Sequence, residues 1–107
     1  MKIVNLTPHD IKLNDGTIFP ASGQVARVKT SYAEIKNVDG VPFTNTEFGE
    51  VQGLPEPQEG TMYIVSGLVK SVPVLSGRTD LCTPCTNHPA TKRDINGQII
   101  SVPCLSM

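Results

Sequence analysis

The sequence predicts a mainly β protein of the small α+β kind: a compact antiparallel meander that closes into a small barrel or roll, with one short helix. Composition supports this in two ways. Val, Ile and Thr together number 29, against 11 for Leu and Ala, and β-branched side chains favour strands over helices. Nine Gly and nine Pro residues supply frequent chain reversals. A chain of 107 residues has the size of one domain, so we expect a single β-rich domain over residues 1–107.

The first strands are bounded by turn residues. We expect a strand over residues 2–6 and a corner over residues 7–10, because Pro8 lacks a backbone N–H and holds the preceding residue extended. Residues 14–16 read Asn-Asp-Gly and predict a hairpin between two short apolar segments. Asp-Gly readily adopts the positive φ angles that a two-residue turn requires.

The meander is expected to continue through the middle of the chain. Residues 24–29 and 32–38 alternate in the way that a strand requires. The Asp-Gly pair at residues 39–40 predicts a second hairpin. Its return strand carries Phe43 and Phe48, which we expect in the core because of their size and apolar character.

The most apolar run of the chain, residues 62–65, is expected to be its central strand, because glycines close to both ends isolate it from its neighbours. Residues 49–60, which precede this run, predict a surface loop through their Gly, Pro and acidic residues. The short helix of the predicted fold follows residues 63–66. Ser66 is its candidate N-cap, and Pro73 limits it to about two turns.

The last third of the chain is expected to contain more turns than strands. Residues 76–90 are polar and rich in turn residues. One further strand is predicted over residues 98–102, after the Asn-Gly turn at residues 96–97. Closure of the strands into a barrel or roll is the architecture that leaves the fewest exposed edges.

Charge and composition exclude several classes of function. Nine basic and ten acidic residues give a net charge of -1, which does not provide the basic surface that direct nucleic-acid binding requires. No apolar run approaches the ~20 residues of a membrane helix, and three cysteines, an odd number, suit a reducing compartment. We therefore expect a cytoplasmic protein. Because no Gly-rich phosphate loop, paired carboxylate motif or nucleophile elbow is present, we assign no catalytic residues.

Three cysteines and one histidine form a candidate zinc set: Cys82, Cys85, His88 and Cys104. Zinc takes four nitrogen or sulfur ligands, and a two-residue spacer lets two thiolates of one turn reach the same ion. A second interpretation is a redox pair of Cys82 and Cys85, although Pro84 between them does not suit the helix start that such pairs usually occupy. A third interpretation makes Cys104 a small buried apolar residue and His88 an exposed loop residue.

Several polar residues stand at turns, where they either stabilise the turn or contact a ligand. Thr7, His9 and Asp10 share the first corner, and short polar side chains at such corners often satisfy turn amides. Two further candidates, Arg78 and Arg93, each have an aspartate close by in the sequence that can form an ion pair. Both readings, structural and ligand-binding, remain open for these residues.

Short strings in a fixed order distinguish this chain from a generic β domain. It opens with Asn-Leu-Thr-Pro-His at residues 5–9. Further strings follow at residues 20–23, 26–27, 54–55, 63–66, 93–94 and 97–100. In this order, which covers most of the chain, it resembles a family of small phage and prophage proteins that open with this pentapeptide. The family pattern has no Cys-x-x-Cys between Asp80 and Arg93, so a zinc site would be particular to this chain.

The resemblance implies a phage accessory protein that acts in the bacterial host cytoplasm as a non-catalytic binding module. The expected role is counter-defence: the module blocks a host defence protein such as a CRISPR nuclease, or sequesters a small nucleotide signal. The candidate ligand-binding residues are Thr7, His9, Arg27, Ser66, Arg78 and Arg93.

The two forms of counter-defence require different surfaces. Arginines gathered at one concave site would hold the phosphates of a nucleotide. Exposed aromatic residues, for which Tyr32, Phe43 and Phe48 are candidates, would instead dock on a protein. The alternative function is a structural or virion-associated assembly module, with or without zinc, whose edge strands pair between the subunits of a homo-oligomer.

Overall fold

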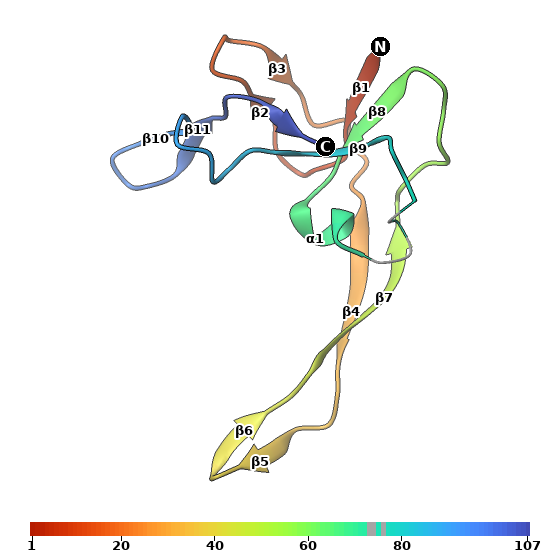
Figure 1. Ribbon diagram of the computed structural model, residues 1–107, viewed down its shortest axis with the longest axis vertical. Coiled ribbons are helices and arrows are strands. Elements are labelled where there is room, and N and C mark those ends of the chain that lie inside the picture. The colour runs from red at the N-terminus through yellow and green to blue at the C-terminus, as the bar shows by residue number, and fades with distance from the viewer. Residues whose placement is uncertain (73–74, 76) are drawn as a thin grey trace.

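The computed structural model describes residues 1–72, 75 and 77–107, and its strands form one four-stranded sheet and four two-stranded ribbons (Figure 1). The main sheet has the order β1-β8-β9-β12, with bounds Lys2–Asn5, Thr61–Ile64, Leu81–Pro84 and Leu105–Ser106. The ribbons pair β2 (Ile11–Lys12) with β3 (Ile18–Phe19), β4 (Arg27–Tyr32) with β7 (Thr46–Gln52), β5 (Lys36–Val38) with β6 (Val41–Phe43), and β10 (Lys92–Arg93) with β11 (Ile99–Ser101).

The main sheet is mixed, which differs from the expected antiparallel meander. β1 is parallel to β8 and β8 is parallel to β9, whereas β12 is antiparallel to β9. The strands of the described residues do not form a closed barrel. The sheet is not a meander because its neighbouring strands are not consecutive in the chain. β1 and β8 are neighbours in the sheet, although the whole of β2 to β7 lies between them in the chain. The mainly β class with one short helix is confirmed.

The helix lies where the sequence places it, in the crossover that parallel strands require. Helix α1 covers Gly67–Lys70, and Ser66 is its N-cap, with a side-chain oxygen that accepts a hydrogen bond from the Val69 N–H. At four residues the helix is about one turn long, shorter than the two turns predicted. Pro73, which was expected to end it, lies outside the described residues.

The core lies between the main sheet, α1 and the base of a long hairpin. Its fully or nearly buried members are Leu6, Ala26, Tyr63, Val65, Val69 and Leu81. β8 lies between β1 and β9, and its last residue, Ile64, has no exposed surface. The prediction of a buried central strand at this point of the chain is therefore confirmed.

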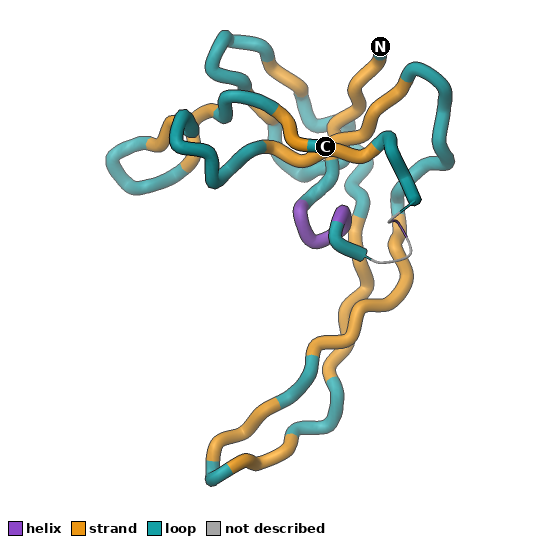
Figure 2. Tube along the Cα trace, viewed as in Figure 1, coloured by secondary structure: helices purple, strands orange, loops and turns teal. Residues whose placement is uncertain are grey.

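Residues 27–52 leave the rest of the molecule as a long hairpin that we call the arm, and the other described residues form the body (Figures 1 and 2). Val28 and Val51 at the base of the arm pack against the core. The arm makes the molecule elongated, with a radius of gyration of 16.6 Å, against about 13 Å for a compact chain of this length. The predicted turn at its tip is confirmed by positive φ angles at Asp39 and Gly40.

One prediction about the arm is wrong, and one strand of the main sheet was not predicted. Phe43 and Phe48, expected in the core, are 56% and 51% exposed because they belong to the arm and nothing in the body covers them. The described residues of the segment expected to be rich in turns, 76–90, are mostly turns and bends, but they also include β9, a strand of the main sheet that was not predicted. Ser76, at the start of that segment, lies outside the described residues.

The strand predicted after the Asn-Gly turn of residues 96–97 is confirmed as β11, and Gly97 has the expected positive φ. The expected surface loop over residues 49–60 begins later, since β7 continues to Gln52. Among the described residues, no helix is long and apolar enough to span a membrane.

Candidate functional site

The three parallel strands end at one edge of the main sheet, and a cavity of about 680 Å³ lies there. The segments that follow these strands supply its walls: residues 7–9 after β1, Ser66 and Gly67 after β8, and residues 83–88 at the end of β9. We call it the carboxyl-edge cavity. In open sheets with parallel strands, ligands commonly bind outside the carboxyl ends of those strands. The cavity is therefore the candidate site.

A buried asparagine fixes the first wall. Asn5 ends β1 and is 2% exposed. Its Nδ2 donates to the carbonyl oxygens of His9 (2.8 Å) and Phe19 (2.9 Å). Its Oδ1 accepts from the backbone N–H of Thr7 (2.9 Å) and from the Thr7 hydroxyl (2.6 Å). Four hydrogen bonds use the full capacity of the amide, so the corner is held in one conformation.

Sequence reasoning missed Asn5. The available signal was a polar residue at the end of an apolar strand, directly before a corner with proline. Asparagine in such a place can hydrogen-bond the backbone of the following residues and stabilise the turn. Of the two interpretations of Thr7, stabilisation of the turn describes what its side chain does, since the hydroxyl donates a hydrogen bond to Asn5 inside the turn.

The two histidines of the chain, His9 and His88, both line the carboxyl-edge cavity. His88 Nδ1 accepts a hydrogen bond from the Ala90 N–H at 3.0 Å. This bond places the ring proton of neutral His88 on Nε2, which then acts as a donor. His9 is held through its carbonyl oxygen by Asn5, and its side chain is exposed. The sequence did not predict that the two imidazoles meet at one cavity. Strand β9, which brings the segment with His88 to the cavity, was itself not predicted.

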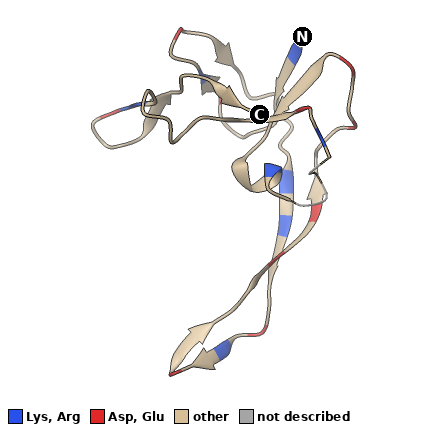
Figure 3. Ribbon diagram, viewed as in Figure 1, with Lys and Arg blue, Asp and Glu red and all other residues tan. Residues whose placement is uncertain are grey.

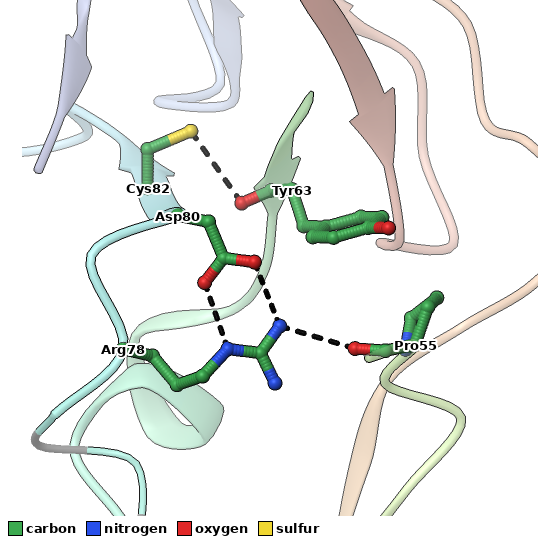
Figure 4. Close-up of polar contacts among 5 residues, drawn as sticks. All are labelled: Pro55, Tyr63, Arg78, Asp80 and Cys82. Atoms are coloured by element: carbon green, nitrogen blue, oxygen red, sulfur yellow. Dashed lines mark hydrogen bonds and ion pairs between the residues drawn. The ribbon is translucent and has the colours of Figure 1, made fainter. Parts of the chain in front are cut away.

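The structure does not bring the four candidate zinc ligands together. Cys82 is buried, its Sγ lies 3.5 Å from the carbonyl oxygen of Tyr63, and burial raises the pKa of its thiol (Figure 4). Cys85 lines the carboxyl-edge cavity instead. The cause is the extended backbone of β9, which Cys85 directly follows: successive residues of a strand point to opposite faces, so residues three apart do as well. Within the described part of the chain, no group of three or more His, Cys, Asp or Glu side chains is arranged to hold a metal ion.

The nearest neighbour of the Cys85 thiol is Cys104. Their Sγ atoms are 3.2 Å apart, with the Cys104 thiol donating. This contact raises the pKa of Cys85, so the thiol stays protonated at neutral pH. The two cysteines that approach one another are thus Cys85 and Cys104, and the pair considered from sequence, Cys82 and Cys85, is separated by the strand.

The three candidate arginines lie away from the carboxyl-edge cavity. Arg27 begins β4 at the base of the arm (Figure 3). Arg78 makes a bidentate pair with Asp80, through Nε to Oδ1 and Nη2 to Oδ2, each 2.8 Å, and also donates to the Pro55 carbonyl (Figure 4). The hydrogen bonds of the pair lower the pKa of Asp80 and raise that of Arg78. Arg78 and Asp80 line a different cavity, near the start of β8.

Arg93 supports the cavity from outside. It donates to the carbonyl oxygens of Gly97 and Thr86, each at 3.0 Å, and Thr86 lines the carboxyl-edge cavity. Of the six candidate ligand-binding residues, the structure therefore brings three together at the cavity: Thr7, His9 and Ser66. Arg78 stabilises another part of the fold, and Arg93 holds Thr86 from outside the cavity.

The carboxyl-edge cavity is polar but carries no fixed charge. Among the described residues, its lining includes no Lys, Arg, Asp or Glu. Hydroxyl groups of Thr83 and Ser106, the Asn87 amide and the two imidazoles offer hydrogen bonds, while Pro8 and Ile11 offer apolar surface. Such a mixture suits a ligand with an uncharged planar part that both stacks and forms hydrogen bonds.

No family model, curated protein or solved structure matches this chain. Its function is therefore inferred from the carboxyl-edge cavity itself.

Proposed function

We propose that this protein is a non-catalytic binding module that captures a small ligand in the carboxyl-edge cavity, and that the ligand contains a nucleoside. The observation that carries the proposal is the convergence of three segments, distant in sequence, on one cavity at the carboxyl ends of parallel strands. Its volume of about 680 Å³ is in the range of small-molecule sites.

The chemistry of the lining supports the ligand class. A nucleobase presents a planar face together with hydrogen-bond donors and acceptors along its edge. The imidazoles of His9 and His88 can stack on such a face, and neutral hydroxyl and amide groups can pair with its edge. The lack of Lys and Arg in the described lining means that recognition acts on the nucleoside part, with any phosphates toward the open mouth.

The state of the thiol at the cavity supports binding without turnover. A cysteine nucleophile requires a depressed pKa or an adjacent base, whereas the pKa of Cys85 is raised by Cys104. The other polar groups of the described lining are hydroxyls, an amide and imidazoles, with no carboxylate to orient a histidine as a general base. The described lining therefore offers groups that can hold a ligand, and we assign none of them a role in activating one.

The resemblance to small phage and prophage proteins supplies the biological setting. A phage protein that binds a nucleotide signal lowers the free concentration of that signal in the host. The proposed role is therefore counter-defence by sequestration, which requires only affinity and an excess of protein over signal.

Thermal melting with a panel of nucleosides, cyclic dinucleotides and ADP-ribose nucleotides tests the proposal. A ligand at a hundredfold excess over its Kd stabilises the native state by about 2.7 kcal/mol. For a domain of this size the melting temperature then rises by roughly 10 °C or more. Mass spectrometry of the nucleotide after incubation checks that it is recovered unchanged.

Two matched variants locate the binding. His9→Ala removes an exposed imidazole whose side chain the corner does not use, and we expect the ligand-induced rise to fall by half or more. Gln58→Ala, in the cavity near the start of β8, should leave the rise unchanged. If no compound raises the melting temperature, capture of a nucleotide is wrong; if the nucleotide is converted, the protein is an enzyme.

A further inference from the structure

Two cysteines that are distant in the chain meet at the wall of the carboxyl-edge cavity. Cys85 directly follows β9, and Cys104 directly precedes β12. Both are free cysteines, and their Sγ atoms are 3.2 Å apart. Cys85 lines the cavity, as does Ser106 of β12. The pair therefore lies where the last two strands of the main sheet reach the cavity.

Strand register explains why the two thiols meet. β12 runs antiparallel to β9, with Leu105 opposite Pro84. One step further along the same register places Cys104 opposite Cys85, and the Cys85 N–H donates to the Cys104 carbonyl oxygen at 3.2 Å. Residues directly opposite one another on antiparallel strands project their side chains to the same face. The backbone of the sheet therefore directs the two sulfur atoms toward each other.

The backbone separation of such a pair suits a disulfide. Opposite residues that share a backbone hydrogen bond in an antiparallel pair have Cα atoms about 5.5 Å apart. The Cα atoms of a disulfide usually lie about 4.4–6.8 Å apart, so the two strands need not move to form one. The sulfur atoms need to approach by about 1 Å, which rotation of the two side chains can supply.

Hydrogen bonds hold the chain beside Cys85 in place. The Thr91 hydroxyl donates to the Cys85 carbonyl oxygen at 2.6 Å. Arg93 donates to the carbonyl oxygen of Thr86, the next residue, at 3.0 Å. Groups that a fold holds in contact react far faster than the same groups on a flexible chain. The two thiols are thus positioned to react with one another.

The three cysteines differ in exposure, and this difference selects the pair. Cys104 is exposed, Cys85 is half-buried and Cys82 is buried. Oxidants react first with accessible thiols, so Cys104 is the first target. Cys82 lies beside the Tyr63 carbonyl oxygen, and burial raises the pKa of its thiol. Cys82 is therefore protected from oxidation in the folded chain.

The contact between the two thiols assigns them different roles. The hydrogen bond with Cys104 raises the pKa of Cys85, which makes Cys85 a poor first target for an oxidant. Oxidation of Cys104 removes the thiol that causes this shift. Cys85 is then the nearest sulfur that can attack the oxidised Cys104. Such a second cysteine resolves the first oxidation product into a disulfide.

We infer that Cys85 and Cys104 form a reversible modification site at which hydrogen peroxide converts the two thiols into an intramolecular disulfide. The Cys104 sulfur attacks one peroxide oxygen and the O–O bond breaks, which gives a sulfenic acid and one water. The Cys85 sulfur then attacks the Cys104 sulfur, the S–S bond forms and a second water leaves. The two thiols lose two electrons, the peroxide gains them, and both thiol protons end in water.

Reduction returns the site to two thiols. Exposed disulfides are more easily reduced than buried structural ones, and an excess of glutathione supplies the two electrons. In a reducing compartment such a disulfide is transient. While present, it closes a ring over residues 85–104 that includes β10, β11 and His88 at the cavity wall. The inference concerns the thiols alone and does not depend on the proposed ligand.

Mass spectrometry of the natural chain tests the inference. The reduced chain is treated with hydrogen peroxide and unfolded, and its remaining thiols are alkylated. We expect one alkylated thiol in place of three, and tryptic peptides 79–92 and 94–107 linked through Cys85 and Cys104. The same treatment of the chain in urea should give a mixture that includes links to Cys82, because the fold no longer selects the pair.

Thermal melting gives a second readout. A disulfide that closes a loop of this length should raise the melting temperature by roughly 10 °C, and glutathione should reverse the rise. Cys85→Ser and Cys104→Ser should each abolish the link and the rise, and neither position is buried. Cys82→Ala is the matched control and should retain both. If that variant does not fold, fragmentation of the linked peptides from the natural chain distinguishes Cys82 from Cys85.

Four results would overturn the inference. They are a native link through Cys82, a disulfide between two chains, oxidation of Cys104 to a sulfinic acid without a link, and a folded chain that stays reduced at a peroxide concentration that oxidises the unfolded chain. None of them bears on nucleotide binding, so the proposed function is tested separately.

Discussion

The body and the arm are built from the same kinds of residue but bury them to very different degrees. In the body, Leu6, Ile64 and Val65 are at most 1% exposed. In the arm, Val38 and Phe43 are more than half exposed, although each belongs to a strand, β5 or β6. Local alternation therefore determines that a strand forms, and the number of layers packed on it determines whether the strand contributes to stability.

The two regions also differ in how they are built. The body has a fixed core and a cavity whose first wall is held by Asn5, as a ligand site requires. The arm has a single layer, and its apolar side chains are largely exposed. Substitutions that are matched in chemistry but placed in the two regions test this contrast.

The largest difference is expected for apolar truncation. Leu6→Ala should lower the free energy of unfolding by about 2–5 kcal/mol, because it creates a cavity in the core. Ile35→Ala, at 66% exposure in the arm, should change it by less than about 0.5 kcal/mol. Urea denaturation at protein concentrations that keep the chain monomeric measures both. Equal losses would mean that the arm is packed within the monomer and that the contrast is false.

Buried and exposed asparagines give the second comparison. Asn5→Leu should cost about 3 kcal/mol, since it leaves the carbonyl oxygen of His9 and the N–H of Thr7 without their partner. Asn37→Leu on the exposed arm should stay within about 0.5 kcal/mol. Denaturation curves give these values, and nucleotide-dependent melting of Asn5→Leu should show a weaker ligand response. An Asn5 variant of unchanged stability would contradict the role assigned to the corner.

Two glycines with positive φ compare the base of the arm with its tip. A Cβ on Gly53 would lie 2.3 Å from the carbonyl oxygen of Val25, whereas a Cβ on Gly40 would meet nothing within 4 Å. Gly53→Ala should therefore cost about 2–3 kcal/mol and Gly40→Ala about 1 kcal/mol, the strain of the left-handed conformation alone. The Gly40 effect should appear as faster hydrogen exchange within the arm, with body amides unchanged. Faster exchange throughout the body would show that the arm and body unfold together.

The smallest expected effect concerns the ion pair of the body. The hydrogen bonds from Arg78 lower the pKa of Asp80 below its ordinary value of 3.8. The folded state thus favours the carboxylate, so the stabilisation is complete above pH 3.8 and is lost as the pH falls through the lower folded-state pKa. Asp80→Asn should cost about 1–2 kcal/mol at neutral pH, since the pair is only 17% and 12% exposed.

Melting curves between neutral and acidic pH measure this effect. The gap between the natural chain and Asp80→Asn should narrow below about pH 4. Asp39→Asn at the tip of the arm is the matched control and should leave the melting profile unchanged. A gap that persists in acid would show that the asparagine disturbs packing rather than the ion pair.

Sequence alone predicts the local features of this fold. The Asp39-Gly40 turn and the Ser66 N-cap follow from the conformational preferences of a few adjacent residues, and both lie where they were expected. β9 was missed because its short segment carries a Thr83-Pro84 step and depends on pairing with β8, which no local pattern reveals. Phe43 was placed in the core because alternation reports that a strand has an apolar face and does not report what covers it.

The same limit applies to the candidate site. Thr7, His9 and Ser66 reach the carboxyl-edge cavity because each lies in the segment that leaves the carboxyl end of a strand of the parallel group. The cysteine spacing suggested a turn, but an extended strand places Cys82 and Cys85 on opposite faces. The partners of the arginines, such as the Pro55 carbonyl for Arg78, are distant in sequence and could not be inferred from neighbouring residues.

The register of β1 on β8 has a consequence for how the chain is made. Lys2 lies opposite Thr61, so the first strand emerges from a ribosome long before its partner exists. The hairpin of the arm needs only contacts between near neighbours and can form during this interval, whereas pairing across such a separation is slow. During synthesis the arm can therefore form before the core. Lys2 can pair with Thr61 only after some sixty further residues have been made.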